Sequence, residues 1–237
     1  MTAIGGRGVL YVATGAPHVA AAAASAASVR RSNPGLPVAI FCDPAPAEPG
    51  AFDHVLAIPD PHVRAKVDLI GHTPFAETLY LDTDTRVVGG LDEVFALLER
   101  FALAAAHRVP DPRRLAREVG HGRPPPSFPE HNTGVLLFRD SPEVAAFLAG
   151  WRAAYRARAK TADQVSFRDA LWASDLRVAV LPRRYNTRSY SWIDAWTWRG
   201  PPPVILHLNR FHPSKQGDGP VRLFRRLEGP VPDGRLR

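Results

Sequence analysis

Residues 78–87 read Thr78-Leu79-Tyr80-Leu81-Asp82-Thr83-Asp84-Thr85-Arg86-Val87, an apolar run that ends in two carboxylates one residue apart. The residues before Asp82 have strand character, and side chains at i and i+2 of an extended chain project to the same side. We therefore expect Asp82 and Asp84 to point at one position just past the carboxyl end of a strand, where open α/β sheets bind their ligands.

Two neighbouring carboxylates repel each other unless a cation joins them. Hard oxygen ligands suit Mg²⁺ or Mn²⁺, and such ions are often also held by substrate phosphates. The pair Asp82 and Asp84 therefore predicts a metal-bridged diphosphate. The alternative is an Asp-rich turn after an edge strand, because the Asp-x-Asp pattern alone is common.

The composition limits the class of protein. A chain of 237 residues with 45% hydrophobic residues is long enough for one α/β domain with a full core. The formal net charge of +7 favours anionic ligands. Cys42 is the only cysteine, which excludes an intrachain disulfide and fits the reducing environment of the cytoplasm. No apolar run reaches the roughly 20 residues of a membrane span, and the Ala-rich run 19–27 predicts a helix, not a signal peptide.

The rest of the chain alternates strands with helices. We expect strands at 9–12, 37–41, 54–58, 78–81, 102–106, 134–138, 178–181 and 204–208. We expect helices at 17–31, 61–70, 91–100, 142–155 and 161–172. This alternation predicts an α/β fold with a mainly parallel sheet. A Pro-, Arg- and Gly-rich loop at about 108–130 and a loose basic tail from about 214 complete a single domain over residues 1–237.

Four motifs follow one another between residues 8 and 215: 73–85 with the Asp-x-Asp pair, Asn132-Thr133-Gly134-Val135-Leu136-Leu137-Phe138, Asp163-Gln164, and Ile205-Leu206-His207-Leu208. In this order and spacing they resemble the GT-A glycosyltransferases, specifically the glycogenin-like retaining enzymes of family eight and their bacterial relatives. The resemblance implies a GT-A fold with a Rossmann-like, mainly parallel sheet flanked by helices. It also implies metal-dependent transfer of a hexose from a nucleotide diphosphate sugar, by default UDP-glucose or UDP-galactose, to an acceptor hydroxyl with retention.

The resemblance implies a role for each matching residue. The ligands of Mn²⁺ (or Mg²⁺) would be Asp82, Asp84 and His207. The donor would also contact Ala13, Thr14, His18, Lys66, Thr83, Asn132, Thr133 and Lys215. The residues closest to the chemistry would be Asp163, Gln164 and Lys66. His18 stands where the family usually has an aromatic that stacks on the base, and residues 209–215 depart from the family's Gly and Lys-Pro-Trp-like ending.

Several of these residues have a structural explanation as well. Lys66 fits the solvated face of an amphipathic helix. Thr161 with Gln164 fits a capping box, and Asp163 in the first turn would favour the helix dipole. His207, within an apolar strand, fits a hydrogen-bonded core histidine.

Two further segments predict the acceptor side of the cleft. The loop leading to Asn132 is rich in arginine (Arg113, Arg114, Arg117 and Arg123). Three tryptophans precede His207, and large aromatics outside a periodic element need a partner surface: Trp192, Trp196 and Trp198. The alternative is that prolines stiffen a surface crossing and the tryptophans form a small satellite core. The acceptor itself stays an unknown hydroxyl compound.

Two other classes of protein use similar features. Haloacid dehalogenase-type phosphohydrolases also place Asp-x-Asp after a strand, but on their first strand and usually with a Thr four residues after the first Asp. Here Arg86 occupies that position and several strands precede it. A non-catalytic polyanion-binding protein would use the basic surface, yet no nucleic-acid-binding motif accompanies the charge, so we expect no nucleic-acid partner.

Overall fold

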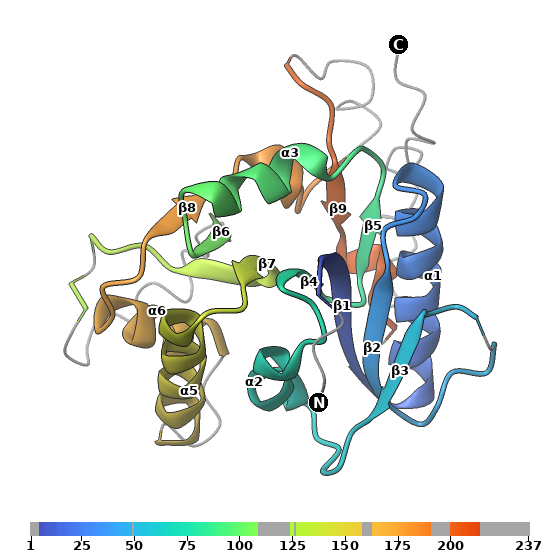
Figure 1. Ribbon diagram of the computed structural model, residues 1–237, viewed down its shortest axis with the longest axis horizontal. Coiled ribbons are helices and arrows are strands. Elements are labelled where there is room, and N and C mark those ends of the chain that lie inside the picture. The colour runs from blue at the N-terminus through green and yellow to red at the C-terminus, as the bar shows by residue number, and fades with distance from the viewer. Residues whose placement is uncertain are drawn as a thin grey trace.

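The computed structural model describes residues 5–48, 50–108, 124–125, 127–157, 163–190 and 200–213 (Figure 1). The strands are β1 (Arg7–Thr14), β2 (Val38–Asp43), β3 (His54–Ala57), β4 (Glu77–Leu81), β5 (Thr85–Val87), β6 (Leu103–His107), β7 (His131–Arg139), β8 (Val178–Val180) and β9 (Ile205–His207). The α-helices are α1 (Ala16–Ser32), α2 (Ala65–Leu69), α3 (Asp92–Phe95), α5 (Pro142–Ala157) and α6 (Asp163–Trp172). Short 3₁₀ helices span Ile70–His72, Ala96–Glu99, Arg183–Tyr185 and Asn209–Phe211.

A seven-stranded sheet with the order β3-β2-β1-β4-β7-β6-β8 forms the centre of the molecule. Strands β3, β2, β1 and β4 run parallel, and β8 runs parallel to β6. Strand β7 is antiparallel to both of its neighbours, β4 and β6. The predicted α/β fold with a mainly parallel sheet is therefore confirmed, with β7 as the reversed strand.

Helices cover both faces of this sheet. Val9 and Tyr11 of β1 point into a core shared with α1 and α3, whereas Leu10 points into a second core shared with α2, α5 and α6. Figure 1 shows α1 on one side of the sheet and α2 with α5 on the other. Because residues of the inner strands alternate between two apolar layers, these strands read as continuous apolar runs.

The last strand lies outside the central sheet. The sequence predicts residues 204–208 as a core strand, but β9 pairs with β5 in a separate two-stranded antiparallel sheet. Strand β5 is absent from the predicted strands because its three residues are too short to give a pattern. In the structure the chain turns after β4, and β5 packs against α1, where the Ser28 hydroxyl accepts a hydrogen bond from the Val87 N–H (2.9 Å).

Two predicted helices have different forms in the structure. The helix predicted at 61–70 begins only at Ala65, and Val63, expected on its buried face, is 91% exposed. The His62 carbonyl instead accepts hydrogen bonds from the Thr14 hydroxyl and the Ala65 N–H, which holds residues 60–64 outside the helix. The helix predicted at 91–100 is α3 followed by a 3₁₀ helix, Ala96–Glu99.

The Ala-rich run 19–27 lies within α1, as predicted. Among the described helices, none combines the length and the apolar character needed to cross a membrane. Most of the predicted loop at 108–130 and the tail from 214 lie outside the described residues.

Candidate functional site

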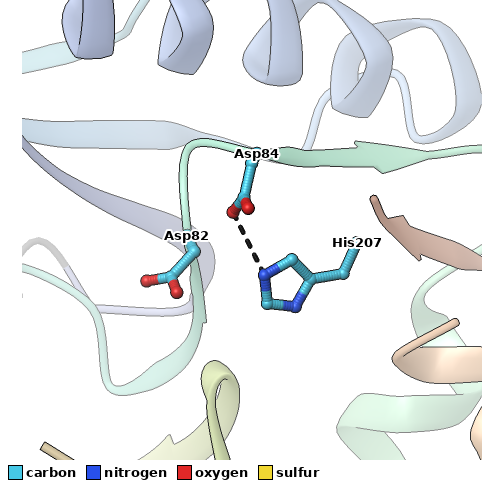
Figure 2. A group of neighbouring side chains, drawn as sticks. All are labelled: Asp82, Asp84 and His207. Atoms are coloured by element: carbon cyan, nitrogen blue, oxygen red, sulfur yellow. Dashed lines mark ion pairs between the residues drawn. The ribbon is translucent and has the colours of Figure 1, made fainter. Parts of the chain in front are cut away.

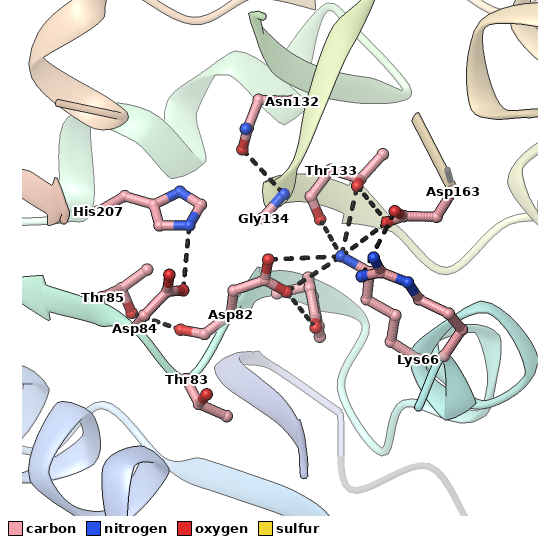
Figure 3. A network of polar contacts seen from close by, with 12 residues as sticks. Lys66, Asp82, Thr83, Asp84, Thr85, Asn132, Thr133, Gly134, Asp163 and His207 are labelled. Atoms are coloured by element: carbon pink, nitrogen blue, oxygen red, sulfur yellow. Dashed lines mark hydrogen bonds and ion pairs between the residues drawn. The ribbon is translucent and has the colours of Figure 1, made fainter. Parts of the chain in front are cut away.

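The ends of β4 and β7 meet at one edge of the sheet. Because β7 is reversed, its first residues lie beside the carboxyl end of β4. The Asp82 N–H donates to the Gly134 carbonyl (2.8 Å), which places Asn132 and Thr133 next to the Asp-x-Asp pair. This arrangement, drawn in Figure 3, brings two of the predicted motifs together at the edge where ligands bind in open α/β sheets.

The two carboxylates converge, but not on an extended strand. The chain turns at Thr83 and Asp84 between β4 and β5, so the extended geometry expected for residues 82–84 is wrong. The Thr85 hydroxyl donates to the Asp82 carbonyl (2.8 Å) and closes this turn. A threonine hydroxyl that bonds the backbone supplies the turn without glycine or proline.

His207 completes a group of three candidate metal ligands. It pairs with Thr85 in the β5–β9 register, and its Nε2 lies 3.1 Å from Asp84 Oδ1 (Figure 2). One ligand atom each from Asp82, Asp84 and His207 lie within 4.8 Å of one another. His207 is 3% exposed, as expected of a core histidine, yet its Nε2 faces a carboxylate.

Gly134 lies directly against two of the three candidate metal ligands. A Cβ at position 134 would lie 2.6 Å from Asp82 Oδ2 and well inside contact distance of His207 Cε1. The missing side chain therefore keeps free the space in front of an oxygen and an imidazole. Two carboxylates and an imidazole around such a space fit Mn²⁺ or Mg²⁺.

Asp84 is ionised at neutral pH. Burial raises the pKa of its carboxyl, but His207, in the form that carries a proton on Nε2 and donates to Asp84, outweighs burial and brings the pKa to about 2. The site therefore offers a negative charge to a cation throughout the physiological pH range.

Lys66 is buried between two carboxylates. The side chain extends from α2 and is 8% exposed, so the alternative explanation of a solvated helix face is wrong for Lys66. Its Nζ lies 2.9 Å from Asp163 Oδ2 and 3.1 Å from Asp82 Oδ1, and it donates to the Thr133 carbonyl (3.3 Å). Burial lowers the pKa of Lys66, but Asp163 and Asp82 more than compensate and raise it above the usual value, so the ammonium stays charged.

Asp163 is the first residue of α6 and points into the same network (Figure 3). Its Oδ2 accepts from the Thr133 hydroxyl (2.7 Å), and Arg64 Nη1 lies 3.5 Å from its Oδ1. Burial raises the pKa of Asp163, but Lys66, Arg64 and Thr133 hold it well below the usual range. Gln164 follows in α6 and is half-buried. Thr161, the predicted capping partner, lies outside the described residues.

The predicted donor-side residues border the Asp-x-Asp turn from β1 and α1. His18 Nδ1 lies 3.5 Å from the Thr83 hydroxyl, and its ring packs edge-on against His212 with centroids 5.4 Å apart. Ala13 is buried near the end of β1, and the Thr14 hydroxyl donates to the His62 carbonyl (3.2 Å). The structure thus brings these residues to the site's edge without assigning their roles.

Other predicted residues lie outside the part of the chain that the structure describes. They are Lys215, the three tryptophans Trp192, Trp196 and Trp198, and the loop arginines Arg113, Arg114, Arg117 and Arg123. The acceptor side of the cleft therefore stays a prediction.

Two further residues, which no sequence motif marks, contact the metal group. The Tyr80 hydroxyl donates to Asp82 Oδ1 (2.7 Å), although Tyr80 reads as a core residue of β4. Asn186 Oδ1 lies 3.0 Å from His207 Nδ1, and Asn186 Nδ2 donates to Asn132 Oδ1 (3.0 Å). Neither had a sequence signal, because Tyr80 lies in an apolar run and Asn186 lies in a segment without a motif.

Comparisons with known proteins give matches only in structure. No family model and no curated protein matches this sequence. The glycosyltransferase GlyE of Streptococcus pneumoniae is 20% identical, with a TM-score of 0.57, over 85% of this chain and 55% of GlyE. The galactosyltransferase LgtC, solved with donor and acceptor sugar analogues, is 15% identical, with a TM-score of 0.58, over 85% of this chain and 86% of LgtC. Mouse xyloside xylosyltransferase 1 is 16% identical, with a TM-score of 0.57, over 85% of this chain and 97% of the mouse protein.

The chain thus spans about half the length of GlyE and most of the other two proteins. All three are glycosyltransferases, and at these identities the likeness concerns the fold. The predicted resemblance is confirmed at that level: the chain has the fold of the GT-A glycosyltransferases.

Proposed function

We propose that this protein is an enzyme that transfers a hexose from a nucleotide diphosphate sugar to an acceptor hydroxyl, with a divalent metal ion held by Asp82, Asp84 and His207. The observation that carries the proposal is the convergence of these three side chains at the edge of a GT-A sheet. The shared fold with glycosyltransferases supports the class of reaction.

The chemistry needs charge stabilisation of the leaving diphosphate. A bound Mn²⁺ or Mg²⁺ would supply positive charge where negative charge grows on the leaving group. Lys66 adds a second, permanent positive charge and holds the carboxylates of Asp82 and Asp163 on either side of its ammonium. Tyr80 orients Asp82 through its hydroxyl, which keeps the carboxylate turned toward the site.

The sugar would lie against the start of β7 and the start of α6. Asn132 and Thr133 adjoin the metal group, and Asp163 presents an ionised carboxylate from the other side. In this arrangement Asp163 steadies positive charge that develops on the sugar, and Gln164 contacts its hydroxyls. Retention follows if the acceptor attacks from the face of the leaving group, a route that needs no dedicated base.

The nucleotide would lie over the ends of β1 and α1. Ala13, Thr14, His18 and Thr83 form this side, and uridine diphosphate carrying glucose or galactose is the donor that we propose. Lys215 and the tryptophans Trp192, Trp196 and Trp198 are assigned to the diphosphate and to the acceptor on the strength of the sequence resemblance alone.

Calorimetric titration with uridine diphosphate tests the proposal. We expect binding in the presence of MnCl₂ and its loss in EDTA or in the Asp84→Asn variant. Asp140→Asn, which changes an exposed carboxylate beyond the opposite end of β7, is the matched control and should bind as the wild type does. Cleavage of simple phosphate esters would indicate a phosphohydrolase instead. A basic binding protein would instead bind polyanions with an affinity that falls as the salt concentration rises and that does not depend on the metal.

A further inference from the structure

A backbone N–H fixes the orientation of Asn132. The Gly134 N–H lies 3.0 Å from Asn132 Oδ1. A backbone N–H can only donate, so the side-chain atom that faces it must be the amide oxygen. The position of oxygen and nitrogen in this amide therefore follows from the main chain alone.

The same reasoning determines how the side-chain amide of Asn186 is oriented. Its Nδ2 lies 3.0 Å from Asn132 Oδ1, and an amide oxygen can only accept, so Asn186 presents its NH₂ group to Asn132. The oxygen of Asn186 then faces His207 Nδ1 at 3.0 Å. Both asparagines are buried, which holds this order of donors and acceptors in place.

This order of hydrogen-bond donors and acceptors also determines which ring nitrogen of His207 carries the hydrogen. Because Asn186 Oδ1 only accepts, His207 Nδ1 must carry the hydrogen. A neutral imidazole has one N–H, so its Nε2 presents a lone pair to Asp84 Oδ1, 3.1 Å away. A lone pair against a carboxylate oxygen is unfavourable unless a cation, either a metal ion or a proton, lies between or beside them.

We propose that Asn186 is a positioning residue that selects the Nδ1–H tautomer of His207 and so turns the Nε2 lone pair toward the metal group. This inference rests on the metal site of the proposed function and adds to it a residue with no sequence signal. Hydrogen bonds from the outer nitrogen of a histidine ligand commonly set its tautomer and raise its basicity.

The wild-type protein tests the tautomer directly. Long-range ¹H–¹⁵N NMR in metal-free, mildly alkaline buffer reports which ring nitrogen carries a hydrogen, and the His207→Gln variant identifies the signals of His207. We expect a hydrogen on Nδ1. A bare Nδ1 with the hydrogen on Nε2 would overturn the proposal, and this measurement requires no change at Asn186.

Two matched variants test the consequence for metal binding. Asn186→Leu removes the acceptor for His207 Nδ1, whereas Asn186→Asp keeps an acceptor, and both remove the NH₂ group that faces Asn132. Second-sphere changes of this kind typically cost about 10- to 100-fold in metal affinity. We therefore expect a loss of about that size for the leucine variant, and most of the wild-type affinity for the aspartate variant, in titrations with MnCl₂ alone followed by the electron paramagnetic resonance of free Mn²⁺.

The outcomes separate this inference from the proposed function. Equal losses in both variants would show that Asn186 acts through Asn132 and not through His207, which contradicts the proposal. If the wild type binds no Mn²⁺, the proposed metal site fails, and the hydrogen on His207 Nδ1 still decides whether Asn186 sets the tautomer. If the leucine variant does not fold, the wild-type spectrum and the aspartate variant still decide it.

Discussion

At the scale of single residues, the candidate metal site depends on a glycine, which has no side chain to fill the space between the ligands. Gly134 lies between His207 and Asp82, and the smallest addition at its Cα reaches both of them. The sequence context of Gly134 resembles a family strand, but only the structure shows what the glycine leaves room for.

Gly134→Ala should strongly weaken metal-dependent nucleotide binding and leave the sheet folded. The new methyl group would displace the His207 ring and crowd Asp82 Oδ2, so we expect Mn²⁺ affinity to fall by about 100-fold, the upper end of losses at perturbed metal sites. Calorimetry measures the affinity, and circular dichroism checks the fold. Gly150→Ala is the control, because a Cβ at that position in α5 meets nothing within 4 Å. If Gly134→Ala binds Mn²⁺ as tightly as the wild type does, the metal does not bind beside Gly134.

His131 should make the stability of the protein depend on pH. It is 4% exposed at the start of β7, and its ring lies 5.2 Å from that of His107. Burial, with a smaller contribution from His107, lowers the pKa of His131 from 6.5 to about 4. As the pH falls from 6.5 to 4, the unfolded chain binds a proton at this residue before the folded one does, so the free energy of unfolding decreases over that window.

Denaturant unfolding at several pH values tests this expectation. His131→Phe should weaken the decrease between pH 6.5 and 4, whereas His72→Gln, a change at an exposed histidine, should preserve it. An unchanged pH dependence in His131→Phe would contradict the assignment.

At the scale of elements, α1 holds the Asp-x-Asp turn in place through hydrogen bonds. The Tyr11 hydroxyl of β1 lies 2.8 Å from the Ser25 hydroxyl of α1, which lies 2.9 Å from the Thr85 hydroxyl of β5. Thr85 in turn donates to the Asp82 carbonyl. A buried chain of hydroxyls therefore connects the central sheet, α1 and β5, and it holds the turn that carries the two carboxylates.

Lys66 connects α2 to β4 and α6, and its replacement should destabilise the protein. Lys66→Met leaves the carboxylates of Asp82 and Asp163 without their ammonium partner. Breaking a buried ion pair by removing one partner typically costs about 3–5 kcal/mol. Arg156→Met is the control: it breaks an exposed pair with Asp68 (2.7 Å) that joins α5 to α2, and such surface pairs contribute about 0–1 kcal/mol. Equal losses in denaturant unfolding of the two variants would show that Lys66 has no special structural role.

At the scale of the whole molecule, five elements supply the site. Lys66 comes from α2, Asp82 follows β4, Thr133 lies in β7, Asp163 opens α6 and His207 ends β9. The reversal of β7 makes this possible, because it brings the start of a strand to the edge where the parallel strands end.

The sequence predicts the elements of the fold better than their pairing. Apolar runs mark the inner strands of the central sheet because these strands are buried on both faces, whereas the edge strands β3 and β8 are partly exposed. The direction of β7 and the pairing of β5 with β9 depend on partners far away in the chain, and a local pattern carries no information about them. The Thr83–Asp84 turn escapes prediction for a different reason: no glycine or proline marks it, and a local hydrogen bond from the Thr85 hydroxyl to the Asp82 carbonyl closes it instead.

The residues of the candidate site also differ in how well the sequence predicts them. Asp82 and Asp84 follow from a local pattern, whereas His207, Asp163 and Lys66 were found only by resemblance to a family. Asn186 and Tyr80 were missed because their importance comes from single hydrogen bonds to residues of the site.

The measurement that tests the central claim most directly is a screen of nucleotide sugars without any acceptor. The purified protein is incubated with UDP-glucose, UDP-galactose and donors with other bases, with MnCl₂ or with EDTA, and the released nucleoside diphosphate is measured. We predict slow hydrolysis of at least one UDP-hexose that requires the metal and disappears in Asp84→Asn. Hydrolysis that persists in EDTA and in Asp84→Asn, or no hydrolysis of any donor by a folded protein, would contradict the account.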